Sequence, residues 1–548
     1  MPRSALLLVF SVGLSLAAGC SPQPDPEPPP AGTPRLLVFV VVDQLGMDTL
    51  ERVRPLLAAD GGLRRRVEEG VVYSEAHHGH AVTYTAPGHA ALATGQPPAV
   101  SGIVANEWLD REAGEAVGAE EQEDGRVGPG RMLVSSIGDW IRSRYPAARV
   151  VAASGKSRGA VFLGGEAADG VFWYDAESGA FASSAVDGEE APWLAGFNDR
   201  GLPPELFSGA AWAPLPVDAE AARAVGFEAF DRGPFDRGLP RLLGGFDWVP
   251  RGGYYGAVYR SPFVDEHLAR LARVLIVEEE LGGDEWPDLL GLSFSALDNV
   301  GHAYGPTSLE ALDVLVRLDR ALGELFALFD QRVGRGAWLV GFASDHGVAP
   351  VPEIAAAGGG ANRRAGAPEV TCLRRAVAAV AERFGVGAWL ADDGYLDRRF
   401  LAERGVDPAE VEAAADALLA ACPGIDAVWT RREIAALPPG PRPVPGSPGW
   451  LPALYRNTWH PERSPDLLLQ TVPDFLPIVG SQTTHASPHP HDTHVPIVLW
   501  RPGLPAATVT EPVLTVDLAP TLARLLGVPV PDGLAGRPLP LPAAAEVD

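Results

Sequence analysis

The sequence predicts an α/β fold: a doubly wound, mostly parallel sheet that is flanked by helices. The fold is expected to contain inserted cap regions. Apolar runs of strand length recur along the chain, and each leads to a polar residue. The four runs are Leu36 to Val42, Arg149 to Ala153, Leu289 to Leu297 and Ala337 to Ala343. Such near-continuous apolar runs are typical of parallel strands that are covered by helices on both faces. Ligands of such sheets bind beyond the carboxyl ends of the strands, which makes the polar residues there candidate site residues: Asp43, Lys156, Asp298 and Asp345.

Helical stretches lie between these runs. Pro87 suits the first turn of a helix that runs to Thr94, and Gly95 is a natural stop. Thr85 then lies at the amino-terminal end of this helix, where unpaired N–H groups favour an anion. A second helix is expected from Ser308 to Asp330, with leucines near helical spacing.

Two regions interrupt this alternation and are interpreted as insertions that cap the functional edge of the sheet. One is rich in Gly, Pro and Trp, and the other has its own helices, for example Pro408 to Ala421. The expected division is a signal peptide (1–20), a Pro-rich tether (21–34), three core parts (35–171, 263–351 and 467–548), a cap insertion (172–262) and a second insertion (352–466).

Composition limits the classes of partner. The chain has 548 residues, 46% of them hydrophobic, and 13 Trp, as expected for a globular protein. A formal charge of −26 argues against nucleic acid, which is held by an excess of Lys and Arg. An acidic protein also repels anions at long range, so any phosphate site here must be positive locally. We expect a small-molecule phosphate ester as substrate and a monomer or weak oligomer.

The amino terminus predicts export. Arg3 is followed by an apolar stretch from Ala5 to Ala17 and by the small residues before Cys20. The stretch is too short to span a membrane. It resembles a bacterial lipoprotein signal in which Cys20 carries the lipid, which implies a lipid-anchored protein of the cell envelope or periplasm. Ala17 stands where that motif more often has Leu, so ordinary secretion remains an alternative.

Cys372 and Cys422 are the remaining cysteines. In an oxidising envelope compartment they can form a disulfide, or they can remain two separate buried thiols. The sequence leaves both possibilities open.

Residue types that bind metals gather after the predicted strands. Asp298 and His302 are separated by three residues, and in a loop at a strand end this spacing lets both bind one metal. Asp345 and His346 precede a Gly that permits a turn. Mixed nitrogen and oxygen ligands suit zinc with a position left for substrate.

These motifs resemble the alkaline phosphatase superfamily, most closely its branch of periplasmic monoesterases with a threonine nucleophile and a Lys-x-Arg element. The motifs resemble the nucleotide pyrophosphatase/phosphodiesterases of the same superfamily less closely. The matching stretches run in order through the chain: Val40-Val41-Val42-Asp43-Gln44, Thr83 to Trp108, Lys156-Ser157-Arg158-Gly159, Ser293 to Pro306, Ser344-Asp345-His346-Gly347, Thr483-Thr484-His485, Thr515 to Leu522 and Gly536-Arg537-Pro538-Leu539.

The resemblance implies two zinc ions and a role for each matching residue. One zinc ion would be held by Asp298, His302 and His485, and the other by Asp43, Asp345, His346 and the hydroxyl oxygen of Thr85. Thr85 would attack phosphorus and form a phosphothreonine. Asn106, 21 residues after Thr85, would bind a phosphate oxygen, and Lys156 and Arg158 would cover the remaining face. With two zinc ions the formal charge of this set is +2, which matches a phosphomonoester dianion better than a diester.

Several alternatives accompany this assignment. Thr83 competes with Thr85 as nucleophile, although the spacing to Asn106 and the Pro-Gly pair after Thr85 favour Thr85. Ala486 stands where the family usually has Gly. His489, His491 and His494 compete with His485 and are expected to have supporting or structural roles. The cluster of His77, His78 and His80 could bind adventitious metal, but a solvated loop is favoured, and His89 and His460 are expected only to pack.

Three other functions compete with a monoesterase. A phosphodiesterase would use the same metals and nucleophile. A sulfatase would need a Cys or Ser where Thr85 stands. A non-catalytic metal-binding lipoprotein would be expected to lack a ligand, and no ligand is missing.

Overall fold

The computed structural model describes residues 27–184, 191–201, 211–228, 239–242, 253–385, 389–391, 394–438, 442–477 and 481–542. Cys20, the predicted signal peptide and the first part of the predicted tether therefore lie outside the described residues. Among the described residues, no helix has both the length and the apolar character that a membrane span requires.

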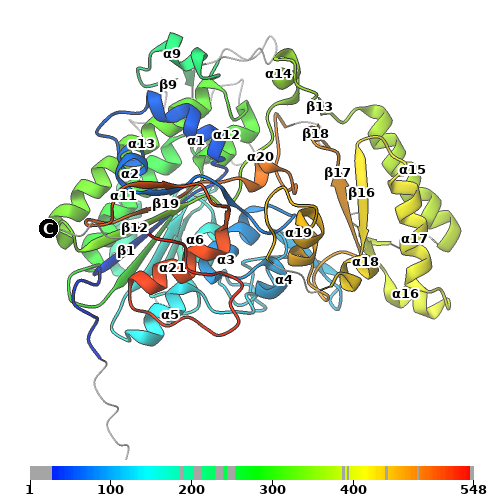
Figure 1. Cartoon of the computed structure of the whole chain (residues 1–548), viewed down its shortest axis with the longest axis horizontal. Coiled ribbons are helices and arrows are strands. Elements are labelled where there is room, and N and C mark those ends of the chain that lie inside the picture. Colours follow the sequence, from blue (N-terminus) through cyan, green and yellow to red (C-terminus); the bar gives the residue numbers. More distant parts are fainter. Residues whose placement is uncertain are drawn as a thin grey trace, which may run out of the picture.

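A nine-stranded sheet forms the centre of the molecule (Figure 1). Its strands, in spatial order, are β20 (Ala507–Val509), β2 (Val71–Tyr73), β19 (Ile497–Trp500), β12 (Trp338–Ala343), β1 (Leu36–Val42), β11 (Asp288–Phe294), β6 (Val150–Ser154), β7 (Gly170–Tyr174) and β8 (Phe181–Ser184). The five strands from β12 to β7 are parallel, whereas β19 and β8 pair antiparallel with their neighbours. The predicted doubly wound, mostly parallel sheet is thus confirmed.

Helices cover both faces of this sheet because successive side chains of a strand point to opposite sides. Val38 and Val40 of β1 belong to a core cluster with α11 (Phe263–Glu278) and α13 (Leu309–Phe329). Phe39 and Val41 belong to a second cluster with α3 (Thr85–Thr94), α5 (Ile137–Arg144) and α21 (Leu518–Leu525). Figure 1 shows α13 and α21 on opposite sides of the sheet.

The two helices expected from the sequence are present. The helix α3 ends at Gly95, whose φ of 66° is the left-handed conformation that glycine adopts readily. The helix α13 begins after Ser308, whose side chain accepts a hydrogen bond from the backbone N–H of Ala311. This contact is a typical amino-terminal cap.

The first predicted insertion begins later than expected. Strands β7 and β8 continue the central sheet beyond residue 172, so part of the segment 172–262 belongs to the core. After them come α7 (Pro192–Arg200), β9 (Ala211–Trp212), α9 (Ala219–Ala224), β10 (Arg241–Leu242) and α10 (Gly253–Tyr259). Trp212 is buried and donates its indole N–H to Asp313 of α13 over 2.7 Å.

The second predicted insertion has a hydrophobic core of its own, formed by α15 (Ala367–Phe384), α17 (Pro408–Leu419), β16 (Ile425–Thr430) and β17 (Leu467–Thr471). These elements lie to the right in Figure 1. The strand β17 pairs antiparallel with β16, so this unit extends beyond the expected boundary at 466. A disulfide joins Cys372 of α15 to Cys422, which decides between the two possibilities that the sequence left open.

The remaining elements connect these layers. They are α1 (Met47–Val53), η1 (Arg54–Leu56), α2 (Gly62–Glu69), β3 (Ala76–His77), α4 (Pro98–Ser101), β4 (Glu107–Asp110), β5 (Glu115–Gly118), α6 (Ser157–Gly164), α12 (Ala296–Tyr304), η2 (Asp330–Gly334), α14 (Pro352–Ala357), β13 (Arg363–Arg364), β14 (Trp389–Ala391), β15 (Tyr395–Leu396), α16 (Arg398–Glu403), α18 (Arg431–Ala436), α19 (Trp450–Thr458), β18 (Phe475–Leu476), α20 (Pro490–Thr493), β21 (Val513–Leu514) and η4 (Thr515–Asp517).

Candidate active site

The polar residues that follow the predicted strands meet at one edge of the sheet. Asp43 follows β1, Asp345 and His346 lie just beyond β12, and Lys156 lies just beyond β6. These strands are parallel and close together in the sheet, so their carboxyl ends lie side by side. Asp43, Asp345 and His346 have no exposed surface, and Lys156 is 6% exposed.

Asp298 and His302 lie on a helix rather than in the expected loop. The strand β11 ends at Phe294, and α12 begins at Ala296. Asp265 of α11 stabilises this start, because its Oδ1 accepts hydrogen bonds from the backbone N–H groups of Ser295 (2.9 Å) and Ala296 (3.1 Å). Residues four apart on a helix share one face, and His302 Nε2 is 3.1 Å from Asp298 Oδ1.

The three predicted histidine ligands are oriented in the same way. Nδ1 of each ring contacts a backbone carbonyl: His302 that of Thr483 (2.9 Å), His346 that of Gly347 (2.9 Å) and His485 that of Thr83 (2.7 Å). A carbonyl oxygen only accepts hydrogen bonds, so Nδ1 carries a proton, and Nε2 is the ring atom that would bind a metal.

Two overlapping groups of side chains have the geometry of metal ligands. Asp43, Asp345 and His346 form one, and Asp298, His346 and His485 form the other, with ligand atoms within 4.8 Å of one another in each. Asp43 Oδ1 and His346 Nε2 are buried without a hydrogen-bond partner. Buried polar atoms are normally paired, so these atoms fit a site built for cations.

Lys156 lies between the two groups of candidate ligands. Its ammonium group is 2.6 Å from both Asp43 Oδ2 and Asp298 Oδ2, one carboxylate from each ligand group. Burial opposes the charge on Lys156, but Asp298 and Asp43 outweigh it and raise the lysine pKa. Burial likewise opposes ionisation of Asp298, yet Lys156 and His302 hold its pKa well below the ordinary value. Burial, with Asp345 beside it, raises the pKa of Asp43 well above the ordinary value.

Thr85 and Asn106 meet at the amino end of α3. Thr85 is the first residue of the helix and is 1% exposed. Asn106 Oδ1 accepts a hydrogen bond from the backbone N–H of Ala86 over 2.9 Å, which leaves the amide NH₂ group of Asn106 as a donor. A Cβ on Gly88 would lie 2.1 Å from the carbonyl oxygen of Asp345, so this helix packs directly against the residues that follow β12.

Thr83 has a structural contact instead. Its hydroxyl donates to the carbonyl of Ser487 over 3.1 Å and accepts from the backbone N–H of Ala486 over 3.2 Å. Ala486 has a φ of 85°, in the left-handed region where glycine is at ease. The backbone at this position therefore has the left-handed conformation that favours glycine, and Ala486 adopts it despite its side chain.

Arg158 is the second residue of α6. Its Nη1 lies 3.7 Å from Glu120 Oε1, which also accepts a hydrogen bond from the hydroxyl of Ser157 over 2.8 Å. The other oxygen of Glu120 is buried without a partner. Glu120 escaped the sequence analysis because it lies between short strands with no motif around it.

Two further residues hold the candidate ligands in place. His89, expected only to pack, has Nδ1 3.2 Å from Asp345 Oδ2 and Nε2 2.8 Å from the Ser293 hydroxyl. Its helical spacing of four from Thr85 is the signal that would have placed it here. Gln44 donates its backbone N–H to Asp345 (3.2 Å) and its side-chain amide to Asp298 (2.6 Å), so it contacts both ligand groups.

The other histidines lie apart from these groups. Nε2 of His489 contacts the carbonyl of Thr471, and Nε2 of His494 contacts the carbonyl of Ser74. His485, in contrast, lies in the ligand group that contains Asp298. The expectation of a solvated loop at residues 77–80 is wrong. His77 is 7% exposed, and His78 and His80 are fully buried, because β3 pairs with β21 and packs beneath the residues after β12.

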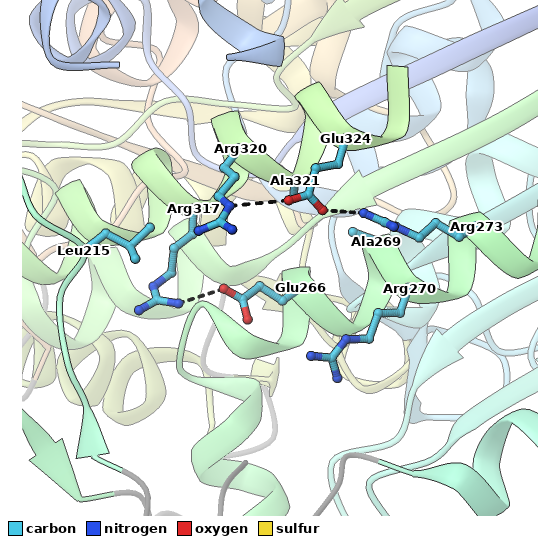
Figure 2. Close-up of a pocket in the computed structure, with 9 residues that line it drawn as sticks. All are labelled: Leu215, Glu266, Ala269, Arg270, Arg273, Arg317, Arg320, Ala321 and Glu324. Carbon is cyan, nitrogen blue, oxygen red and sulfur yellow. Dashed lines mark hydrogen bonds and ion pairs between the residues drawn. The ribbon is translucent and has the colours of Figure 1, made fainter. Parts of the chain in front are cut away.

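A groove of about 430 Å³ between α11 and α13 is separate from the candidate active site. Figure 2 shows its charged side chains pairing with one another, Arg317 with Glu266 and both Arg320 and Arg273 with Glu324. No candidate catalytic or metal-binding residue lines it.

The fold and this set of residues define a phosphoesterase of the alkaline phosphatase superfamily. The chain belongs to the type I phosphodiesterase / nucleotide pyrophosphatase family, whose profile matches residues 37–363.

Its relatives include enzymes named as alkaline phosphatases. Alkaline phosphatase PhoK of Sphingomonas sp is 31% identical, with 94% of this chain and 92% of the relative covered. Alkaline phosphatase PafA of Elizabethkingia meningoseptica is 26% identical, with 92% and 94% covered. The crystal structure of PafA superposes with a TM-score of 0.81 at 26% identity, covering 92% of this chain and 98% of PafA. The chain is therefore an alkaline phosphatase-like hydrolase of the PafA/PhoK type.

Proposed function

We propose that this protein is an exported, zinc-dependent alkaline phosphatase that hydrolyses phosphate monoesters through a phosphothreonine at Thr85. One observation carries this proposal: Asp43 Oδ1 and His346 Nε2 are buried without a hydrogen-bond partner and lie close to the buried Asp345 carboxylate. Asp345 packs against the first turn of α3, where Thr85 lies.

The proposed ligands are Asp298, His302 and His485 for one zinc ion and Asp43, Asp345, His346 and Thr85 for the other. When bound, two such ions stabilise charge on the entering and leaving oxygens of an in-line displacement. Thr85 Oγ1 gives its proton to solvent and attacks phosphorus, the bond between phosphorus and the ester oxygen breaks, and the departing oxygen takes a proton from solvent to leave as the alcohol. Water then attacks the phosphothreonine, which releases phosphate and restores Thr85.

The other residues orient the phosphoryl group. The side-chain NH₂ group of Asn106, at the amino end of α3, donates to its oxygens. Arg158 supplies a planar pair of donors, which suits the free oxygens of a monoester dianion better than the single charge of a diester. A PafA variant with a solved structure is altered at a Thr, an Asn, a Lys and an Arg. Its Thr and Asn are 21 positions apart and its Lys and Arg two apart, the same spacings as Thr85–Asn106 and Lys156–Arg158 here.

Substitution of Thr85 tests the nucleophile. Thr85→Ala should reduce turnover of p-nitrophenyl phosphate by about 1,000-fold or more, because it removes the attacking oxygen, whereas Thr85→Ser should retain measurable activity. Acid quenching of the wild-type reaction and mass spectrometry should find a phosphate on the peptide that contains Thr85. Thr83→Ala serves as the control. Phosphate on Thr83, or full activity of Thr85→Ala, would contradict the proposal. Absence of turnover in the wild type itself would favour a non-catalytic protein.

The type of ester needs a separate test, since the family also includes phosphodiesterases. We expect kcat/KM for p-nitrophenyl phosphate to exceed that for bis-p-nitrophenyl phosphate. Arg158→Ala should reduce this ratio by at least tenfold, because it removes donors used only by the monoester. A diester preference in the wild type would make the phosphodiesterase the better assignment.

Export and anchoring rest on residues outside the described part of the chain. We propose that residues 1–19 are removed and that Cys20 becomes the first residue and carries a lipid. The residues that follow would form the tether, and the two inserted regions would shape access to the site. Expression in a bacterial host should place the wild type in the membrane fraction, labelled by a fatty-acid analogue. Cys20→Ser should lose this label, and a wild type without label would support ordinary secretion.

A further inference from the structure

A second cluster of ligand-type side chains lies where β3 meets the segment that precedes β19. Glu75, His77 and His494 each offer one ligand atom, and these atoms lie within 4.8 Å of one another. None of them belongs to the candidate active site. We propose that they form a third metal site, which takes zinc or a similar divalent transition ion independently of the proposed catalytic pair.

The backbone brings these side chains to one face. His77 and His494 form an antiparallel bridge, and residues directly opposite in such a pair project to the same side. Their rings stack with centroids 4.6 Å apart and planes 12° from parallel. Glu75 lies in the turn directly before β3. Its carboxylate is 4.0 Å from His77 Nε2.

The chemistry of the three groups suits a transition metal. Nε2 of His494 contacts the carbonyl of Ser74 over 2.7 Å and therefore carries the proton, which leaves Nδ1 with a free lone pair. Burial, with His494 and His78 nearby, lowers the pKa of His77 to about 3, so its ring is neutral at physiological pH. Two neutral imidazoles and a carboxylate are a common zinc ligand set, and a fourth position is left for water.

Binding requires one imidazole ring to turn out of the stack, because the in-plane lone pairs of two nearly parallel rings do not meet at one ion. Ligand atoms around one tetrahedral zinc lie roughly 3.3 Å apart, given metal–ligand bonds of about 2.0 Å. The side chain of Glu75 is 47% exposed, so it is free to turn toward the histidines and also leaves a path for the ion. On the other side, the ring of Trp450 from α19 lies edge-on to His77 at 5.9 Å.

A metal in this position would have a structural role. It would tie β3 to the chain entering β19, two segments that are distant in sequence. His78, next to His77, contacts the carbonyl of Ser344 over 3.0 Å, and Ser344 precedes the candidate ligand Asp345. The third site would thus lie near the candidate active site without contributing a ligand to it.

The test counts metal ions in the full-length protein. Wild type, Glu75→Gln and His494→Phe are loaded with zinc, freed of excess and measured by inductively coupled plasma mass spectrometry. Each variant should hold one zinc ion per chain fewer than the wild type while its turnover of p-nitrophenyl phosphate is unchanged. Phe retains the stacked ring and removes only the ligand nitrogen. Glu115→Gln, a substitution of another surface carboxylate, should hold as many ions as the wild type.

Anomalous diffraction at the zinc edge locates the ions directly. We expect a peak bounded by Glu75, His77 and His494, separate from any peak at Asp43 and Asp298. Equal zinc counts in wild type and Glu75→Gln, or no anomalous peak beside His77, would overturn the third site. Zinc beside His77 but none near Asp43 would support this site and contradict the proposed catalytic metals, so the two proposals fail separately.

Discussion

At the scale of single residues, the candidate active site is a balance of buried charges. Three carboxylates come together away from water, an arrangement that is costly unless cations are near. Lys156 supplies one positive charge from between the two ligand groups, and the unpartnered atoms of Asp43 and His346 mark where further positive charge fits. A phosphate site in a chain of net charge −26 thus depends on a few local cations.

Glu120 provides a residue-scale prediction, because it is the carboxylate that lies beside Arg158. Glu120→Gln removes the charge that holds this guanidinium and should lower kcat/KM for p-nitrophenyl phosphate about 5-fold, or about 1 kcal/mol. The rate with bis-p-nitrophenyl phosphate and the zinc content should not change. The neighbouring Glu121→Gln is the control. An equal loss with both esters would mean that Glu120 supports the fold and does not position Arg158.

At the scale of elements, the helices α3 and α12 place candidate site residues at the edge of the sheet. The helix α3 presents Thr85 at its first position and His89 one turn later, so a single element holds the proposed nucleophile and a contact to Asp345. The helix α12 places Asp298 and His302 on one face. In both cases a spacing of four residues brings two functional side chains together.

The disulfide Cys372–Cys422 gives a prediction for the unit built on α15, α17, β16 and β17, which contains none of the candidate metal ligands. It closes a loop across a sequence separation of 50, which corresponds to about 4 kcal/mol of stabilisation by loop entropy. Cys372→Ser combined with Cys422→Ser should lower the melting temperature of the unit built on α15, α17, β16 and β17 and speed its proteolysis. Turnover of p-nitrophenyl phosphate at 25 °C should be unchanged. Proteolysis at the wild-type rate would show that the bond contributes little.

At the scale of the whole molecule, the candidate ligands come from segments spread over most of the chain. Asp43 follows β1, Asp298 lies beyond β11, Asp345 lies beyond β12, and His485 lies in the approach to β19. Because neighbouring strands in the sheet are far apart in sequence, ions bound at this edge would hold the central sheet and its covering helices together.

Metal removal tests this view. Ligands that bind only the folded state stabilise it, by about 4 kcal/mol at 1,000 times the dissociation constant. Treatment with a chelator should therefore abolish activity and lower the main melting temperature by about 5–10 °C. Added zinc should restore both, and magnesium should not, because the ligand set contains imidazoles. An unchanged melting temperature after verified zinc loss would contradict this coupling.

Much of the fold was accessible from the sequence because its signals are local. The apolar run from Leu36 to Val42 forms the strand β1. The Pro-Gly pair lies in the first turn of α3, and Gly95 directly follows its last residue. The run through Leu297 was misread, since an apolar strand and the apolar first turn of α12 are continuous in composition. The start of the first insertion was placed too early because β7 and β8 lie in a stretch rich in Gly and aromatic residues.

By itself, the sequence determined the type of sheet and the residues that gather at its edge, since strand polarity places the residues after parallel strands together. Only the tertiary structure decided which side chains touch. Lys156 between Asp43 and Asp298, Glu120 beside Arg158 and His77 opposite His494 are contacts between distant segments. No periodicity along the chain encodes such contacts, because they arise from the packing of complete elements against one another.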